Sequence, residues 1–173
     1  RFYAAALIEN LGKNFDNLYG PAYKGIPLAV TAGIALQQSH NHNVSITYNR
    51  KEAKDHGEKG TLIGHQYSGS EKVVIIEDVV TAGTSVRESM EILTANHSPK
   101  VAAVIVSVDR MERGQGQLTA TQEIKNQFGM PVFSITTVRE IITYLHNRPV
   151  AGRILLDDVR KAQMESYLAA YGV

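Results

Sequence analysis

The sequence predicts an α/β protein with a central, mostly parallel β-sheet flanked by helices. Segments typical of strands and of helices alternate along all 173 residues. Residues 73–76 are four consecutive β-branched residues, Val-Val-Ile-Ile, which favour a central parallel strand buried on both faces. Strands separated by helices indicate a parallel sheet covered on both sides, with right-handed crossovers. Because we find no repeat, low-complexity tract or linker, we expect a single domain over residues 1–173.

The expected elements of the first half follow from the apolar spacing. Phe2, Ala5 and Ile8 recur at helical spacing at the start of the chain. From these patterns we expect a helix over 1–11, a short strand over 17–19, a helix over 26–39 and a strand over 44–48. The first helix starts without a capping residue, so we expect that residues are missing upstream of it.

The second half continues the same alternation. Val86, Met90 and Leu93 fit one face of a helix that follows the apolar strand. We then expect a strand over 101–109, a helix over 117–128, a strand over 132–136, a helix over 138–146 and a final amphipathic helix over 157–170. In such sheets, ligands bind beyond the carboxyl ends of the strands. This rule places Gly20–Gly25, Glu77–Ser85 and Asp109–Arg110 on one rim.

Two adjacent carboxylates, Glu77 and Asp78, end the apolar run. Because side chains alternate along a strand, we expect these two to point to opposite faces. An unpaired buried carboxylate is costly, so it normally gains a partner or takes up a proton. We expect a ligand to be that partner.

The small-residue loop from Thr81 to Ser85 leads into the next helix. Backbone N–H groups at a helix N-terminus attract anions, and three hydroxyls add donors here. Neither GxxxxGK[ST] nor GxGxxG is present. Acceptors for sugar hydroxyls beside donors for a monophosphate imply a ribose 5-phosphate ligand. The alternative is an ordinary strand-to-helix turn with a polar cap.

Two further groups lie on the predicted rim. The loop GPAYKG, Gly20–Gly25, brackets Lys24 with glycines that let the backbone approach an anion, although a plain connection is the alternative. Arg110 follows an apolar strand, and its planar guanidinium matches a carboxylate. A surface ion pair with Asp109 is the alternative for Arg110.

The stretch 49–60, NRKEAKDHGEKG, is the most charged part of the chain, and its cations outnumber its acids. This stretch directly follows the strand expected over 44–48, so it begins at the predicted rim. One interpretation is a solvated surface loop. The other is a flexible lid that closes over a diphosphate, neutralises developing charge and excludes water.

Composition excludes several classes of function. Lys plus Arg is 18 and Asp plus Glu is 17, so the net charge of +1 argues against nucleic-acid and membrane-surface binding. The chain has no cysteine, which excludes disulfides and thiolate chemistry. No apolar run approaches the roughly 20 residues that cross a bilayer, and the start has no signal-peptide layout. We therefore expect a cytoplasmic protein.

The motif EDVVTAGTS after an apolar strand resembles the signature of the type I phosphoribosyltransferases, which bind phosphoribosyl pyrophosphate (PRPP). GPAYKG, RKEAKDHGE, RESMEI and SVDRMERG, at their spacings, are similar to the bacterial orotate-specific branch of that family. The similarity covers almost the whole chain. One segment is absent, namely the amino-terminal part that supplies a lysine and aromatic residues around orotate in that branch.

The resemblance implies transfer of the 5-phosphoribosyl group from PRPP to orotate, giving orotidine 5-monophosphate and pyrophosphate in pyrimidine biosynthesis. It implies PRPP binding by Tyr23, Lys24, Arg50, Lys51, Lys54, His56, Glu77, Asp78, Val79, Val80, Thr81, Ala82, Gly83, Thr84 and Ser85. Among these, Lys54, Glu77 and Asp78 are the implied catalytic residues. Thr81 and Arg110 are the implied contacts of orotate.

The resemblance also implies a cofactor, a partner and a backbone feature. Mg²⁺ is expected to bind mainly through PRPP, with no dedicated metal ligands in the chain. The lid is expected to reach into the site of a second subunit, so the protein is expected to be a homodimer. Members of the family often have a cis peptide in the glycine-bracketed loop, which corresponds here to Ala22–Tyr23.

Two other functions stay open. A type I phosphoribosyltransferase for adenine or another base would keep EDVVTAGTS but lack RKEAKDHGE and Arg110. A non-catalytic regulator on the same fold would need a basic nucleic-acid surface, which the near-neutral charge argues against.

Overall fold

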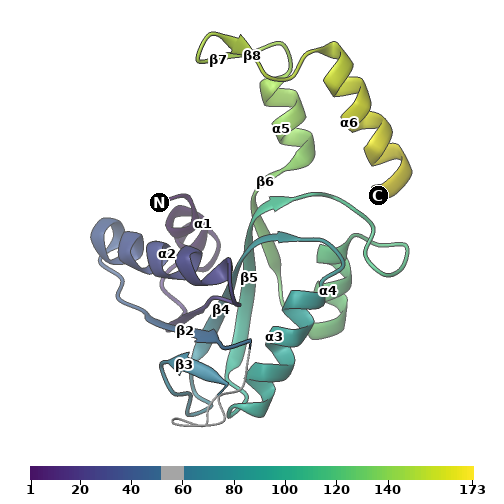
Figure 1. Ribbon diagram of the computed structural model, residues 1–173. Helices are drawn as coiled ribbons and strands as arrows, with labels where there is room; N and C mark the ends of the chain where they lie inside the picture. The colour runs from purple at the N-terminus through teal and green to yellow at the C-terminus, as the bar shows by residue number, and fades with distance from the viewer. Residues whose placement is uncertain (52–60) are drawn as a thin grey trace.

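The protein is described by a computed structural model, which covers residues 1–51 and 61–173. Within these ranges, six strands form one sheet in the order β3-β2-β1-β4-β5-β6 (Figure 1). The strands are β1 (Asn17–Tyr19), β2 (Ser45–Asn49), β3 (Leu62–Gly64), β4 (Lys72–Val80), β5 (Lys100–Asp109) and β6 (Val132–Thr137). Every neighbouring pair is parallel except β2 and β3, so the predicted mostly parallel sheet is confirmed.

Helices cover both faces of this sheet, as Figure 1 shows. The helices are α1 (Phe2–Leu11), α2 (Gly25–His40), α3 (Thr84–Ala95), α4 (Ala120–Phe128), α5 (Val138–Leu145) and α6 (Asp158–Tyr171). Val74 and Ile76 of β4 pack in one cluster with residues of α1 and α2. Val73 and Ile75 pack in another with residues of α3 and α4. All four side chains are fully buried, which confirms the central strand that the β-branched run predicts.

Some boundaries differ from the expected ones for physical reasons. Helix α4 begins at Ala120, three residues later than expected, because Thr119 and Gln122 form a capping box. Strand β4 continues past the two carboxylates to Val80, since Val79 and Val80 still pair with β5. The acid pair therefore lies within the strand rather than at its tip.

Three short strands escaped prediction. β3 has three residues, and β7 (Pro149–Val150) and β8 (Arg153–Ile154) have two each. The turn between β7 and β8 is Ala151-Gly152, both with positive φ, of 49° and 77°. Such a turn usually carries Asn-Gly or Asp-Gly, so this hairpin lacks the usual sequence signal.

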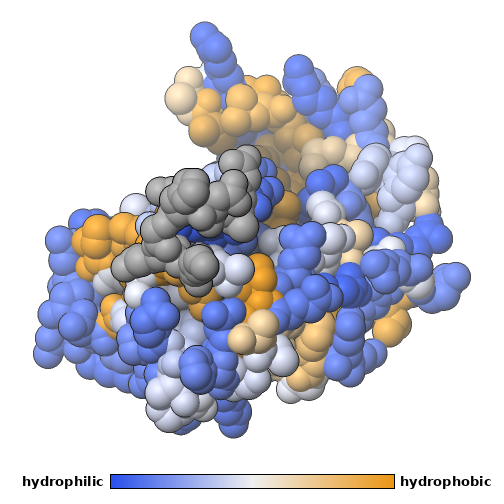
Figure 2. Space-filling model, turned by 60° about the horizontal axis from the view of Figure 1, so that its bottom comes forward, coloured by the Kyte–Doolittle hydropathy of each residue, from blue (hydrophilic) through white to orange (hydrophobic). Residues whose placement is uncertain are grey.

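The segment from α5 to α6 extends beyond the end of the sheet (Figure 1). It has a small core of its own, made of Ile142, Leu156 and Leu168. Figure 2 shows apolar side chains gathered over this part, where Val150 and Leu155 are exposed. None of the helices in the described ranges has the length and apolar character that a bilayer span requires.

The turn that precedes β4 is held by the Glu71 carboxylate. It accepts hydrogen bonds from the backbone N–H groups of Ser68 and Gly69, at 2.9 Å and 3.0 Å, and contacts His65 Nε2 at 3.1 Å. Desolvation by burial raises the pKa of Glu71, but these hydrogen bonds outweigh it and bring the pKa from 4.5 to about 2. The carboxylate form is therefore the form that the fold stabilises.

We expect Glu71→Gln to lower the Tm at neutral pH, and the difference from wild type to shrink in acid. A carboxyl group with a lowered folded pKa stabilises the fold above its unfolded pKa and loses this contribution as the pH falls through the folded value. The window therefore runs from 4.5 down to about 2. Thermal unfolding followed by circular dichroism at several pH values measures it. The control is Glu165→Gln, an exposed carboxylate on α6, and a Tm difference that stays constant across the window would contradict the prediction.

Candidate active site

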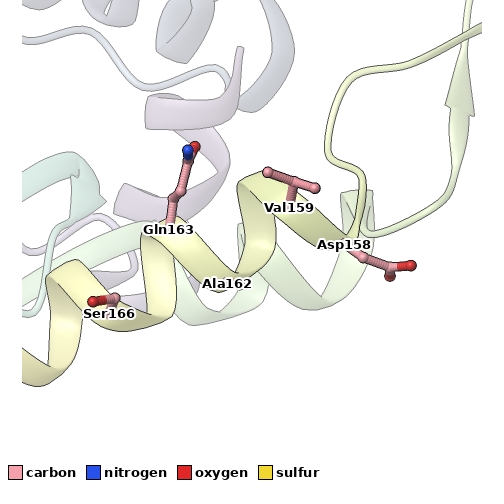
Figure 3. A pocket seen from close by; sticks show the side chains of 5 residues that line it. All are labelled: Asp158, Val159, Ala162, Gln163 and Ser166. Carbon is pink, nitrogen blue, oxygen red and sulfur yellow. The ribbon is translucent and has the colours of Figure 1, made fainter.

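A cleft of about 1150 Å³ opens at the carboxyl ends of the central strands. Its walls include Lys24 from the loop after β1, Arg50 after β2, Asp78 on β4 and Arg110 after β5. The three segments that the sequence placed on one rim therefore do meet. A second hollow, of about 670 Å³, lies beside α6 and is lined by Asp158, Val159, Ala162, Gln163 and Ser166. All of these come from one helix, and their side chains do not converge (Figure 3), so we assign the site to the cleft.

The loop Gly20–Gly25 forms one wall of the cleft. Its Ala22–Tyr23 peptide is cis, as expected. Ala22 N–H donates to Asn49 Oδ1 at 2.8 Å, so the end of β2 fixes the loop. A Cβ on Gly25 would lie 2.8 Å from the carbonyl oxygen of Ile76, so only glycine allows this close approach to β4.

Three cationic side chains and an aromatic ring line the cleft beside this loop. Tyr23 is 65% exposed, and Lys51 Nζ lies 5.5 Å from its ring centroid. Lys24 and Arg50 line the same cleft. Four of the residues expected to bind PRPP are thus together, whereas Lys54 and His56 lie outside the described residues.

The two carboxylates point to opposite sides of β4, as expected. Glu77 is 7% exposed and accepts a hydrogen bond from the Ser85 hydroxyl at the start of α3. Asp78 pairs with Lys24 Nζ at 2.9 Å, on the side of α2. We expected a ligand as the partner of these acids, but each already has a partner in the protein. The physical reason is that β4 continues to Val80 and brings both acids within reach of neighbouring loops.

The protonation of the two acids differs because their surroundings differ. Desolvation by burial raises the pKa of Glu77, and the Ser85 hydrogen bond only partly offsets it. Burial also raises the pKa of Asp78, but hydrogen bonds from Lys24 and the Val79 amide bring it below its ordinary value. Of the two acids, Asp78 is therefore the one whose ionised form the surroundings stabilise. Its partner Lys24 is 77% exposed in its side chain, so the ion pair opens onto solvent.

The loop after β4 surrounds a smaller hollow of about 290 Å³. Gly83, with φ of 77°, caps α3, and the first amides of that helix follow it. The hollow is lined by Val79, Val80, Thr81, Gly83, Thr84 and Ser85, among others. These six are among the residues implied to bind PRPP, whereas Ala82 does not line the hollow and its carbonyl oxygen accepts a hydrogen bond from Arg87. Thr81 and Ser85 also line the main cleft, so the hollow and the cleft adjoin.

Arg110 lines the cleft on the side of β5. Its Nη2 contacts Glu112 Oε1 at 2.5 Å, and Glu112 Oε1 also accepts from the Tyr167 hydroxyl of α6 at 3.0 Å. The alternative of a surface ion pair with Asp109 is wrong in its partner: the partly exposed Arg110 pairs with Glu112, whereas Asp109 accepts from the Met111 amide. The guanidinium is thus oriented by Glu112, and α6 reaches the site through Tyr167.

Two residues that hold parts of the site, Tyr3 and Asn49, were given no role of their own from the sequence, although Asn49 begins the charged stretch 49–60. The Tyr3 hydroxyl on α1 lies 2.5 Å from the carbonyl oxygen of Glu77 and 2.6 Å from Ser107 Oγ. No sequence signal marks Tyr3, because the contact with Glu77 spans 74 positions. Asn49 could have been found, since it is a polar residue at the end of a strand on the predicted rim.

The described residues include no group of three or more His, Cys, Asp or Glu side chains suited to a metal ion. Glu77 and Asp78, which are neighbours in the sequence, both line the cleft. A cation there would take most of its ligands from a bound diphosphate and from water, an arrangement that Mg²⁺ commonly adopts.

Comparisons with known proteins show the family of the chain. Residues 1–149 match the model of the phosphoribosyl transferase domain. The chain is 46% identical over its full length to orotate phosphoribosyltransferase of Clostridium acetobutylicum, covering 77% of that protein. It is 48% identical to the same enzyme of Clostridium beijerinckii over 99% of this chain and 76% of that protein.

A solved structure gives the same result. The crystal structure of orotate phosphoribosyltransferase from Francisella tularensis superposes with a TM-score of 0.78 at 31% identity, over 99% of this chain and 77% of that one. The site geometry, the domain model and these relatives agree, and the chain belongs to the orotate phosphoribosyltransferase family.

Proposed function

We propose that the protein transfers the 5-phosphoribosyl group of PRPP to orotate, forming orotidine 5-monophosphate and pyrophosphate, a step of pyrimidine biosynthesis. The observation that carries this proposal is that the acid pair and Arg110 line one cleft, which adjoins the hollow at the start of α3. Sequence identity of 46% to a curated relative over the whole chain supports the choice of base.

The acid pair and the adjoining hollow fit the ribose 5-phosphate part of PRPP. Asp78, with its lowered pKa, accepts hydrogen bonds from the ribose hydroxyls, and Glu77 assists from the other side of the strand. The hollow from Val79 to Ser85 takes the 5-phosphate through the first amides of α3 and through hydroxyl groups. When the bond from C1 to pyrophosphate breaks ahead of bond making, positive charge grows on the ribose, and the fixed carboxylates stabilise it.

The cationic wall fits the diphosphate. Tyr23, Lys24, Arg50 and Lys51 line the cleft, and by resemblance Lys54 and His56 join them. Lys24 is exposed enough to turn from Asp78 toward a phosphate oxygen. Mg²⁺ bound by the diphosphate supplies further positive charge to the leaving group. These cations offset the negative charge that pyrophosphate gains as it leaves with the bonding electrons.

On the other side of C1, the orotate N1 anion attacks and the configuration inverts. Arg110 binds the carboxylate of orotate through its planar fork, and Thr81 lies close enough to the cleft to contact the base. Because orotate N1 is already acidic, no strong general base is required.

The family resemblance extends the proposal to assembly. The working unit is a homodimer in the cytoplasm, in which the stretch 49–60 closes over the diphosphate in the site of the second subunit. Analytical ultracentrifugation of the full-length protein tests the dimer, and a monomer at working concentrations would contradict it.

A spectrophotometric assay of orotate consumption tests the function. The protein is mixed with PRPP, Mg²⁺ and orotate, and in parallel with adenine. We expect turnover that requires PRPP and orotate together. Turnover with adenine but not with orotate would assign the protein to another branch of the fold, and PRPP binding without any turnover would favour a regulator.

We expect Lys54→Ala to lower kcat far more than it weakens PRPP binding. A contact made mainly in the transition state should cost about tenfold or more in kcat when it is lost. Steady-state kinetics and isothermal titration with PRPP separate the two effects. Lys161→Ala on α6 is the control, because that lysine is remote from the cleft and pairs with Glu165. A kcat within about twofold of wild type would refute the role of Lys54.

A further inference from the structure

An ion pair behind the cleft joins two segments of the site. Arg87 lies in the first turn of α3, and its Nη2 lies 3.4 Å from Glu123 Oε2 on α4. The side chains of Arg87 and Glu123 are 19% and 16% exposed, so the pair is mostly shielded from water. Shielded charge pairs interact more strongly than exposed ones and are sensitive to the loss of either partner.

Each member of the pair also holds the backbone of a different loop. Arg87 Nη1 donates to the carbonyl oxygen of Ala82, in the loop that surrounds the 5-phosphate hollow. Glu123 accepts from the N–H groups of Gln115 and Gly116, at 2.9 Å and 2.6 Å. These two belong to the segment 111–119, which directly follows Arg110. The pair thus connects the phosphate side of the site with the base side.

Two glycines show that both loops are shaped around this pair. A Cβ on Gly83 would lie 2.9 Å from Arg87 Nη1, and the φ of Gly83 is 77°. A Cβ on Gly114 would overlap both carboxylate oxygens of Glu123. A larger residue at either position would push the end of the Arg87 or Glu123 side chain aside, and the positive φ of Gly83 further favours glycine there.

We propose that Arg87 and Glu123 are positioning residues that hold the phosphate-binding loop and the segment after Arg110 in a fixed position relative to each other. The proposal rests on the function proposed above and adds a coupling between the sites for PRPP and for the base. Within the described part of the chain, the walls of the cleft and of the 5-phosphate hollow are built from other residues, so both members act through the loops they hold.

The test is a double-mutant cycle in the full-length protein with Arg87→Gln, Glu123→Gln and the double variant. Glu123→Gln should raise the KM and Kd for PRPP, although Glu123 holds the loop of the base side. Arg87→Gln should raise the KM for orotate, although Arg87 holds the phosphate loop. Each increase should be about threefold to tenfold, and the double variant should be little worse than the poorer single one, because coupled residues are not additive. Arg87→Lys is a milder variant with the same expected direction.

A matched control separates positioning from general stability. Glu140→Gln removes a carboxylate that also accepts a backbone N–H at the start of a helix, α5, but does not line the cleft. It should lower the Tm without changing either KM. The proposal is overturned if Glu123→Gln leaves PRPP affinity unchanged, or if the two single effects multiply in the double variant. PRPP affinity is measured by titration without a base, so a wild type that binds PRPP but does not consume orotate would refute the function and leave this test intact.

Discussion

Asp78→Asn should lower kcat/KM for PRPP by about 100-fold or more. Asp78 is the acid of the pair whose ionised form is stabilised, because hydrogen bonds from Lys24 and the Val79 amide lower its pKa. Asparagine keeps the shape and one acceptor oxygen but removes the charge that stabilises a positively charged ribose. Removing one preorganised electrostatic contact of a transition state commonly costs about 10²- to 10³-fold in rate. The greater part of the loss should therefore appear in kcat.

Steady-state kinetics with varied PRPP measures this effect. Asp157→Asn is the matched control, since Asp157 caps α6 and lies away from the cleft. It should leave kcat/KM close to that of wild type. If Asp78→Asn retains more than about a third of wild-type kcat, Asp78 serves only to hold Lys24, and the assignment of the ribose to this strand is lost.

Much of the fold follows from local sequence pattern. The run Val73–Ile76 predicts a buried central strand, because a strand buried on both faces carries apolar side chains at every position instead of alternating apolar and polar ones. The structure confirms this strand. The rule that ligands bind at the carboxyl ends of parallel strands predicts that Lys24, Asp78 and Arg110 lie on one rim, and all three line the cleft. Local pattern and sheet topology together were sufficient to find the cleft.

What the sequence did not reveal depends on contacts between distant positions. The Tyr3 hydroxyl meets Glu77 across 74 positions, and Arg87 meets Glu123 across 36. Neither residue type is unusual on a helix, so nothing local marks these contacts. The protein partners of Glu77 and Asp78 were missed for the same reason, since they depend on how far β4 extends and on where the next loops pack.

The position of Arg110 could be predicted from the sequence, but the orientation of its side chain could not. Its position after β5 follows from the strand pattern, whereas its partner Glu112 is fixed by Tyr167 on α6, 55 positions away from Glu112. Glu112 holds the guanidinium and also brings a negative charge close to the place where an orotate carboxylate would bind. In the role proposed for it, Arg110 would have to offset the charge of Glu112 as well as bind the carboxylate of orotate.

Arg110→Ala should weaken binding of orotidine 5-monophosphate by about 10- to 100-fold, because a charge-assisted hydrogen bond contributes about 1.5–3 kcal/mol. Uridine 5-monophosphate differs from it by the absence of the carboxylate, so its binding should change much less. Loss of Arg110 also leaves Glu112 beside the substrate carboxylate, and the two would repel. The double variant Arg110→Ala/Glu112→Gln should therefore regain part of the lost affinity.

Titration calorimetry of the full-length protein with the two nucleotides measures this preference directly. Arg148→Ala is the matched control, because Arg148 lies over the Tyr144 ring at 4.2 Å on the far segment after α5. It should leave both affinities unchanged. An equal loss of affinity for both nucleotides in Arg110→Ala would mean that Arg110 supports the cleft as a whole. The carboxylate would then have to be recognised by a residue outside the described part of the rim.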